Sequence, residues 1–219
     1  MSLDLVSKYD RVAEGFAEQS YANLQFDMRR RFVISTTWGK TLCSGDSVLE
    51  IGCGDGYLAR LFVKHGLHYR GFDNSPKMVA MGQEKLRAAG LQAEFVVADV
   101  SQVSLSEPVD ALVSYMGTFF FYIGDPLAVL KRFRPYIRTK VILDLNPRKT
   151  DLGAAIEILK KAGFRNVRWR PFFVPKEKKL PVGMLETLVF CEDIPVLRRI
   201  PLRWKFNVLI KGDADEPDL

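Results

Sequence analysis

The sequence predicts an α/β fold in which helices cover a mainly parallel β-sheet. Short apolar runs typical of buried strands alternate with segments of helical period along most of the 219 residues. A glycine-rich turn joins the first of these runs directly to a helix, and no linker-like stretch interrupts the alternation. The apolar share of 47% and the charged share of 26% are those of an ordinary globular chain. We therefore expect a single domain over residues 1–219.

The predicted strands are short and rich in apolar or β-branched residues. The first, SVLEI, runs into the glycine turn, and the second and third end at Asp73 and Asp99. Both faces of a parallel sheet are covered, so such strands read as nearly continuous apolar runs. The expected strands are 47–51, 69–72, 93–98, 110–114, 140–145, 166–172 and 206–210.

The predicted helices are marked by their ends. Ser75 and Pro76 form an N-cap and a first helical position, and Gly90 and Gly163 follow the last turns of two helices. The amphipathic stretch 3–38 predicts two helices broken near residues 20–23, within a helical lid over 1–40. The other expected helices are 57–65, 76–89, 126–136, 152–162 and one near 184–191.

The most informative segment is Val48–Arg60, with the sequence VLEIGCGDGYLAR. An apolar strand runs into the turn Gly52–Gly56 and then directly into a helix. Glycines let a backbone turn sharply and approach a ligand without an intervening Cβ. Ligands of open α/β sheets bind outside the carboxyl ends of the strands, so the turn predicts a ligand site there.

The glycine spacing separates two classes of cofactor. A dinucleotide fingerprint has the spacing G-x-G-x-x-G, whose third glycine packs the helix against the strand. In this chain Tyr57 occupies that third position, and the last glycine, Gly56, comes one residue earlier. Glu50 also stands two residues before the first glycine. The spacing therefore disfavours a nicotinamide dinucleotide.

Two further carboxylates fall at the ends of the next strands. Asp73 lies about twenty residues beyond the turn, where a carboxylate can accept the protons of both ribose hydroxyls. Asp99 ends the third strand in the string FVVADV. Each alone is as readily a helix cap or a turn residue. Together with Glu50 they place acids on three successive strands, which capping does not explain.

An acidic residue in the first strand followed by G-x-G-x-G resembles motif I of the class I S-adenosylmethionine-dependent methyltransferases, of the methyltransferase-domain 11 or 25 kind. The resemblance extends over roughly Tyr9 to Gly212 and is closest to the small-molecule methyltransferases. It implies a Rossmann-like seven-stranded, mainly parallel sheet of order 3-2-1-4-5-7-6, with the last strand antiparallel and helices on both faces. It also implies a cofactor-binding core over 44–146 and an insert over 173–203.

The resemblance further implies S-adenosylmethionine as methyl donor, S-adenosylhomocysteine as product, and direct displacement at the sulfonium methyl group. Glu50 would face the amino group of the methionine moiety, Asp99 and Val100 would meet the adenine, and Ser114–Met116 would lie beneath the sulfonium. The residues expected to bind the cofactor are Tyr9, Glu50, Gly52, Cys53, Gly54, Asp55, Gly56, Tyr57, Asp73, Asn74, Met78, Asp99, Val100, Ser114, Tyr115 and Met116.

Few residues are candidates for a general base. His65 and His68 belong to the amino-terminal edge of the sheet, opposite the edge where the chemistry is expected. The remaining catalytic candidates are Tyr21, Tyr115, Asp144 and Glu186. Asp144 could equally satisfy a loop backbone. We hypothesise that the acceptor needs no general base because it is an amine, an acidic hydroxyl or an activated carbon.

The acceptor is expected to be a small aromatic or apolar molecule. The string MGTFFFYIG over 116–124 places four aromatic residues after the fourth strand, of which at least two are expected to pack against a helix. The others, with Trp169, Phe172 and Phe173, would wall the acceptor pocket. Arg29–Arg31 and Arg148 are candidates to meet an anionic group. Residues 194–206 are interpreted as a pocket cover rather than a membrane-binding surface.

Composition excludes several other classes. The formal charge of +6 comes from scattered basic residues without interleaved aromatics, so nucleic acid is not expected as a partner. Three cysteines without a C-x-x-C pair disfavour a disulfide framework and a structural zinc site, and no metal is expected. No apolar run approaches the roughly 20 residues that span a bilayer. We expect a cytoplasmic monomer or homodimer without a transmembrane segment.

Three alternatives remain. A nicotinamide-dependent oxidoreductase would need the six-residue glycine spacing and a catalytic Tyr/Lys pair or His on the substrate side. A non-catalytic S-adenosylmethionine-binding protein would be expected to lack some of the strand-end acids and glycines. A nucleic-acid or protein methyltransferase that methylates amino groups usually carries a string ending in Pro-Pro-Tyr or Pro-Pro-Phe after strand four, where this chain has Ser114-Tyr-Met-Gly.

Overall fold

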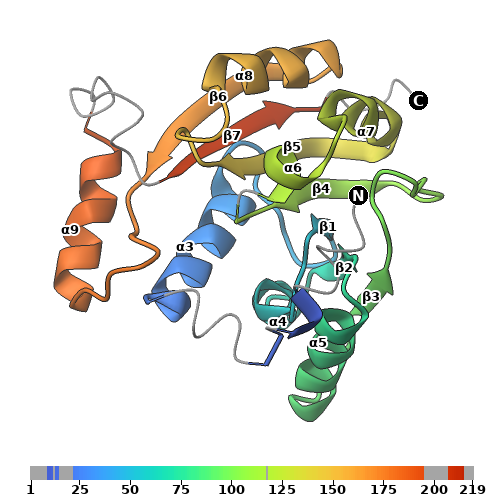
Figure 1. The fold of residues 1–219 in the computed structure, drawn as a ribbon, viewed down its shortest axis with the longest axis horizontal. Helices are drawn as coiled ribbons and strands as arrows, with labels where there is room; N and C mark the ends of the chain where they lie inside the picture. Colours follow the sequence, from blue (N-terminus) through green and yellow to red (C-terminus); the bar gives the residue numbers. More distant parts are fainter. Residues whose placement is uncertain (1–8, 12, 15–21, 117, 195–206, 215–219) are drawn as a thin grey trace.

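A seven-stranded sheet forms the centre of the computed structural model, which describes residues 9–11, 13–14, 22–116, 118–194 and 207–214 (Figure 1). The strand order is β3-β2-β1-β4-β5-β7-β6. The strands from β3 to β5 are parallel to their neighbours, and β7 is antiparallel to both β5 and β6. The predicted strand order and the reversed last strand are confirmed.

The strands lie close to the predicted ranges, and five of them, β5 and β7 among them, are longer. They are β1 (Ser47–Ile51), β2 (His68–Asp73), β3 (Glu94–Val97), β4 (Val109–Ser114), β5 (Ile137–Leu145), β6 (Arg165–Phe172) and β7 (Asn207–Asp213). β5 begins three residues earlier than predicted, and β7 continues through the polar string Lys211–Asp213. The polar end of β7 carries no apolar pattern, but it pairs with Lys140–Ile142 of β5, whereas the added start of β5 pairs with β4 through Ile137. Pairing with a neighbouring strand thus overrides local composition.

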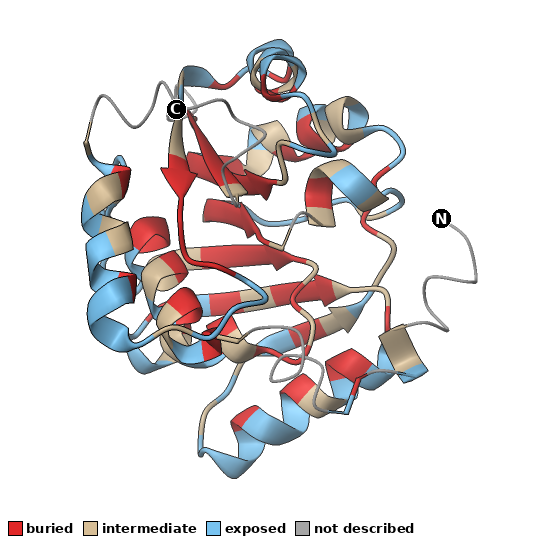
Figure 2. Ribbon diagram, turned by 60° about the vertical axis from the view of Figure 1, so that its left-hand side comes forward, coloured by how far each residue is buried: buried red, intermediate tan, exposed pale blue. Residues whose placement is uncertain are grey.

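Helices cover both faces of the sheet. One face carries α3 (Leu24–Thr37), α4 (Tyr57–Lys64), α5 (Pro76–Ala88) and α9 (Val182–Glu192). The other carries α6 (Thr118–Tyr122), α7 (Pro126–Phe133) with the 3-10 turn η1 (Arg134–Tyr136), and α8 (Leu152–Lys161). In Figure 2 the central strands are mostly buried, whereas the edge strands are partly exposed and the helices expose their outer faces. The aromatic segment after β4, predicted as a loop, contains the one-turn helix α6.

Side chains of β1 belong to the hydrophobic cores on both faces of the sheet. Val48 packs in the core beneath α3 and α4, whereas Leu49 and Ile51 pack beneath α7 and α8. Successive side chains of a strand point to opposite faces, so a strand covered on both sides must be apolar nearly throughout. Glu50 is the exception: it shares the α3–α4 face with Val48 and is 4% exposed.

The helix starts follow the capping pattern. The Ser75 side chain accepts a hydrogen bond from the Met78 backbone N–H at 3.1 Å, and Pro76 occupies the first helical position, as predicted. Asp125 and Asp151 cap α7 and α8 in the same way. These caps satisfy backbone donors that a helix leaves open.

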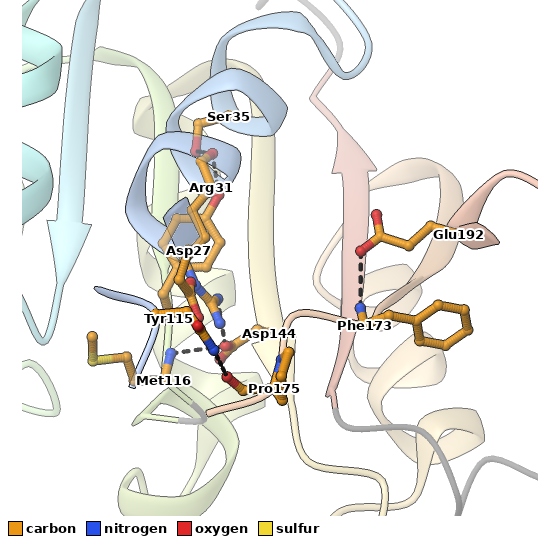
Figure 3. Close-up of polar contacts among 10 residues, drawn as sticks. Asp27, Arg31, Ser35, Tyr115, Met116, Asp144, Phe173, Pro175 and Glu192 are labelled. Carbon is orange, nitrogen blue, oxygen red and sulfur yellow. Dashed lines mark hydrogen bonds and ion pairs between the residues drawn. The ribbon is translucent and has the colours of Figure 1, made fainter. Parts of the chain in front are cut away.

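The guanidinium of Arg31 fixes α3 to the sheet. Arg31 is fully buried and forms ion pairs with Asp27 on the same helix and with Asp144 of β5, the latter at 2.7 Å (Figure 3). Its charge also lies 4.5 Å from the ring centroid of Phe172 and 5.0 Å from that of Tyr115. Burial raises the pKa of Asp27, a cost that the neighbouring guanidinium opposes.

A buried lysine holds the carboxyl end of the same helix. The Lys140 ammonium donates hydrogen bonds to the carbonyls of Thr36, Trp38 and Lys40 at 3.4, 3.1 and 2.7 Å. A cation at this end of a helix also interacts favourably with the helix dipole. Burial lowers the pKa of Lys140 to about 8. The middle and the carboxyl end of α3 are therefore held to β5, by Arg31 and by Lys140 respectively.

We predict that Arg31→Met strongly destabilises the protein. Methionine fills much of the same space but leaves two buried carboxylates without their guanidinium, and losing one partner of a buried ion pair costs about 3–5 kcal/mol. Arg29→Met on the same helix changes an exposed side chain and should stay within about 0.5 kcal/mol of the wild type. Urea denaturation measures both variants. Equal unfolding free energies for the two would contradict this account of α3.

Candidate functional site

The carboxyl ends of β1, β2 and β4 surround an open cavity of about 1110 Å³, here called the first cavity. The residues predicted to bind the cofactor and found in its lining are Tyr9, Glu50, Gly52, Cys53, Gly54, Asp55, Tyr57, Asp73, Asn74, Met78, Val100, Tyr115 and Met116. The cavity is also lined by residues that the sequence reasoning missed, among them Met28, Leu58 and Thr118. No local signal marks these three, because their places depend on how α3, α4 and α6 dock on the sheet.

The glycine turn belongs to this cavity, except for its last residue. Gly56 is in the left-handed conformation with φ of 73°, and a Cβ built on it would lie 2.6 Å from the Phe95 ring. Gly56 therefore allows β3 and α5 to pack against the turn and does not line the cavity. This role is the helix-to-strand packing that the third glycine of a dinucleotide fingerprint performs.

Asp73 ties the glycine turn to the end of β2. One carboxylate oxygen accepts a hydrogen bond from the Gly54 backbone N–H at 2.8 Å, and the other accepts one from the Ser75 N–H at 2.9 Å. Burial raises the pKa of Asp73, and these backbone donors oppose that shift. The carboxylate is thus held at the cavity wall in one orientation, with its oxygens able to accept further hydrogen bonds.

Glu50 is the most perturbed carboxylate of the site. Its side chain is buried, and burial raises its pKa to about 8, although the Tyr69 hydroxyl donates a hydrogen bond to it at 2.6 Å. The sequence analysis missed Tyr69. Gly71, two residues along the same strand, makes this contact feasible, because a Cβ there would lie 2.8 Å from both the Tyr69 hydroxyl and the Cys53 sulfur.

Asp99 and Ser114 do not line the first cavity. The Asp99 carboxylate accepts hydrogen bonds from the Ser101 backbone N–H and hydroxyl at 2.9 and 2.7 Å, whereas its neighbour Val100 does line the cavity. Ser114 is fully buried and donates to the Ile51 carbonyl at 2.8 Å. Asp99 thus stabilises a turn and Ser114 links β4 to β1, although the resemblance implied that both bind the cofactor.

The catalytic candidates among the described residues do not include an available base. Asp144 lies outside the cavity lining, and its Oδ2 accepts hydrogen bonds from Arg31 and from the Met116 backbone N–H, so it is a structural anchor rather than the predicted base. Tyr115 lines the cavity, but its hydroxyl lies 2.5 Å from the Ser35 hydroxyl, and burial raises its pKa. Tyr21 lies outside the described residues. Glu186 lines neither this cavity nor the one described next.

A second cavity of about 640 Å³ shares the lining residues Met116 and Tyr122 with the first. Its remaining lining residues are polar or basic apart from one aromatic ring. They are Arg31, Phe121, Asn146, Lys149, Thr150, Lys176 and Asn207. Met116 is a non-glycine residue with a positive φ of 68°, which is rare outside strained functional positions.

The aromatic run after β4 divides between core and cavity. Phe119 is buried in the core beneath α7 and α8, and Phe120 packs against the same core, which confirms that at least two of these rings pack. Phe121 and Tyr122 line the second cavity. The expectation that Trp169, Phe172 and Phe173 wall the acceptor pocket is wrong, since none of them lines either cavity. Phe172 packs beneath Arg31, and Trp169 packs against the opposite core.

Of the basic candidates for an anionic acceptor group, Arg31 lines the second cavity, but Arg29, Arg30 and Arg148 do not. Arg30 instead donates to the Glu192 carboxylate at 3.0 Å, which joins α3 to α9. The cationic residues that the cavity does gather, Lys149 and Lys176, come from loops far apart in the sequence.

The amino-terminal segment lies over the first cavity. The Tyr9 hydroxyl donates a hydrogen bond to the Tyr122 hydroxyl at 2.7 Å, and the two rings meet edge to face. Ser75 donates to the Asp10 carboxylate at 2.5 Å. These contacts place the described part of the predicted lid across the ends of β2 and α6.

Two general features complete the description of the site. The described residues contain no group of three or more His, Cys, Asp or Glu side chains arranged to hold a metal ion. None of the described helices combines the length and the apolar character that crossing a bilayer requires.

Comparison with known proteins identifies the segment that carries the first cavity. The model of the family described as "Methyltransferase domain" matches residues 48–140. The search of curated proteins gave no match. The matched segment runs from β1 into β5, and it contains Glu50, the glycine turn and Asp73.

Solved structures share the fold at low sequence identity. Magnesium protoporphyrin IX methyltransferase from Synechocystis PCC 6803, with bound S-adenosylmethionine, is 17% identical with a TM-score of 0.60, over 98% of this chain and 86% of that one. The [4+2]-cyclase SpnF is 13% identical with a TM-score of 0.70, over 97% and 96%. Haemonchus contortus phosphoethanolamine N-methyltransferase 2, with S-adenosylmethionine, is 17% identical with a TM-score of 0.64, over 85% and 53%.

The cyclase illustrates that this fold by itself does not fix the reaction. The match to the methyltransferase domain bears on the reaction, which the fold does not fix. It covers the strand-turn-helix segment and the acidic residues at the strand ends of the first cavity. Residues 48–140 match a methyltransferase domain, and the chain shares the fold of S-adenosylmethionine-dependent methyltransferases of known structure.

Proposed function

We propose that this methyltransferase transfers the methyl group of S-adenosylmethionine to a small-molecule acceptor by direct displacement. The observation that carries the proposal is the charge of the first cavity. Glu50, Asp55 and Asp73 line it, and no Lys, Arg or His does so among the described residues. This lining suits a cofactor that bears a sulfonium and an ammonium group, and it disfavours a pyrophosphate, whose two negative charges would face carboxylates.

The proposed roles of the cofactor-binding residues follow from their positions. Asp73 accepts hydrogen bonds from the ribose hydroxyls, and Glu50 faces the ammonium group of the methionine moiety. Asp55 is offset by Lys85, whose ammonium lies 2.5 Å from its carboxylate, so Asp73 carries the negative charge of the lining, and Glu50 joins it when the ammonium of the cofactor stabilises its ionised form. Met78 and Val100 provide apolar surface for the adenine.

The bound cofactor supplies an electrophilic methyl group, and the chain aligns the acceptor with it. Met116 and Tyr122, which line both cavities, mark the place where donor and acceptor meet. No histidine lines either cavity, and no carboxylate lines the second, among the described residues. This lining supports the hypothesis that the acceptor needs little help from a general base. The single-domain organisation, the cytoplasmic location and the monomeric or dimeric state stay predictions.

Calorimetry of the purified protein tests the choice of cofactor. We expect saturable binding of S-adenosylmethionine and S-adenosylhomocysteine and no binding of NADH, because the acidic cavity opposes a pyrophosphate. Radiolabelled methyl transfer to phenols, amines, quinols and fatty acids then tests for turnover. Binding of NADH without binding of either sulfur cofactor would overturn the proposal.

We predict that Asp73→Asn weakens binding of S-adenosylmethionine by about 10-fold or more. The change removes a charge from a group that hydrogen-bonds the ribose, and such bonds contribute about 1.5–3 kcal/mol. Asp99→Asn should have a smaller effect, because that carboxylate is turned onto Ser101. Asp46→Asn, whose side chain accepts from the Cys43 N–H before β1, serves as the matched control. Equal affinities for the Asp73 and Asp46 variants would contradict the ribose assignment.

Glu50 should make the stability of the cofactor-free protein depend on pH. Burial raises its pKa from 4.5 to about 8, so the folded state holds a proton that the unfolded chain has lost. Its contribution is fully present below pH 4.5, and the free energy of unfolding falls by about 1.4 kcal/mol per pH unit as the pH rises toward 8. The fall ends above the folded pKa.

Urea denaturation at pH 5 to 8 of the wild type and of Glu50→Gln isolates this contribution, since glutamine does not titrate. We expect the variant to gain stability relative to the wild type as the pH rises. Saturating S-adenosylmethionine should flatten the wild-type dependence, because its ammonium stabilises the ionised carboxylate. Parallel pH profiles for the two cofactor-free proteins would contradict the prediction.

A further inference from the structure

We propose that the second cavity binds the methyl acceptor, and that this acceptor is a small planar molecule with a carboxylate or phosphate at the end remote from the methyl-accepting atom. The inference rests on the proposed function, because it takes the first cavity as the donor site. It adds a chemical class to an acceptor that the sequence predicted only as aromatic or apolar.

The wall between the cavities fixes the orientation of the acceptor. Met116 and Tyr122 line both cavities, so the accepting atom must lie beside them to reach the donor. Asp144 accepts a hydrogen bond from the Met116 N–H at 2.8 Å and thereby holds its left-handed backbone. Tyr122 is held by the hydrogen bond from Tyr9. The other residues of the second cavity face the remainder of the molecule.

The charged groups lining the second cavity are all cationic: Arg31, Lys149 and Lys176. Asp27 and Asp144, which do not line the cavity, each form an ion pair with Arg31. Asp144 and Asp27 also raise the pKa of Lys176, although burial lowers it overall. The charges of these two carboxylates offset those of Arg31 and Lys176, so Lys149 carries the excess positive charge. Its ammonium forms no ion pair with any carboxylate in the described part of the chain, and it lies 4.4 Å from the Phe121 ring centroid.

Uncharged hydrogen-bonding groups surround these cations. Asn146, Thr150 and Asn207 complete the polar lining. The Asn146 side-chain oxygen accepts from the Arg148 backbone N–H at 2.9 Å, so its NH₂ group is the part that can serve a ligand. Amide and hydroxyl donors beside lysine ammonium groups form a set that suits the oxygens of a carboxylate or phosphate.

The aromatic part of the lining accounts for the planar body. Phe121 is 52% exposed, which is unusual for a large apolar side chain, and its ring meets that of Tyr122 edge to face at 4.8 Å. Both side chains come from α6 and line the cavity with Met116. A flat, apolar ligand body beside the Phe121 ring, with its anionic end toward Lys149, would cover the exposed part of the ring.

Ligand-observed NMR on the protein saturated with S-adenosylhomocysteine tests the inference. The probes are benzoate, phenyl phosphate and benzamide, which share a ring and differ in charge. We expect both anions to bind about fivefold or more tightly than benzamide, the scale of an exposed charge pair of up to about 1 kcal/mol. The ratio of benzoate to phenyl phosphate affinity then identifies the preferred anion. The preference for anions should shrink as the salt concentration rises.

Single lysine substitutions test which residues cause the preference for anions. Lys149→Gln should reduce the preference for the anions about fivefold, and Lys176→Gln should also reduce it, with the affinity for S-adenosylhomocysteine unchanged in both. Lys64→Gln at the end of α4 removes the same charge from an exposed helix position and should change nothing.

The possible failures are distinct. If S-adenosylhomocysteine does not bind the wild type, the proposed function fails and the inference falls with it. If it binds but benzamide equals benzoate, or if Lys149→Gln and Lys64→Gln behave alike, the inference alone is overturned and the donor site stands.

Discussion

The ion pair between Arg31 and Asp144 is the interaction on which the site depends. It joins α3 to β5, and the same carboxylate oxygen accepts from the Met116 N–H, so one group sets both the helix position and the loop after β4. A buried ion pair of this kind offers modest net stability, because both charges lose their hydration. Its value here is geometric, since it holds a residue with positive φ at the wall between two cavities.

The two cavities have opposite electrostatic character although they share a wall. The first is lined by carboxylates, and Glu50 is buried with little direct compensation beyond the Tyr69 hydroxyl. The second is lined by lysines together with amide and hydroxyl side chains that can donate hydrogen bonds. An unpaired buried charge is costly in a folded protein, and such costs persist where they serve a ligand. A cationic donor would relieve the cost of ionising the buried Glu50, whereas an anionic acceptor would meet exposed lysines in the second cavity.

The fold brings these groups together because parallel strands place their carboxyl ends at one edge of the sheet. β1, β2 and β4 contribute the donor cavity, whereas the loops after β4, β5 and β6 and the start of β7 contribute the second one. The antiparallel β7 matters in this respect. Because β7 runs antiparallel to β5 and β6, its first residue, Asn207, lies at the same edge of the sheet as their last residues. There it adds a polar group to the second cavity.

The strand order was predicted from the family resemblance, whereas the sequence by itself determined the strand-turn-helix unit and most of the lining of the first cavity. These features depend on local patterns: apolar periodicity, glycine spacing, and acids at strand ends that face one edge whatever the rest of the chain does. Glu50, Asp73 and the turn between them lie within a single βαβ unit, so their relative positions follow from the backbone.

Only the tertiary structure decided the direction and pairing of individual side chains. Asp144 was as consistent with a base as with an anchor until α3 brought Arg31 against it. Phe172 and Trp169 fitted an acceptor pocket in sequence, yet β6 buries Phe172 in one core and packs the partly buried Trp169 against the opposite one. Lys149, Lys176 and Asn207 carry no common motif, because the second cavity joins loops distant in the chain. Long-range packing sets such contacts, and no local pattern encodes it.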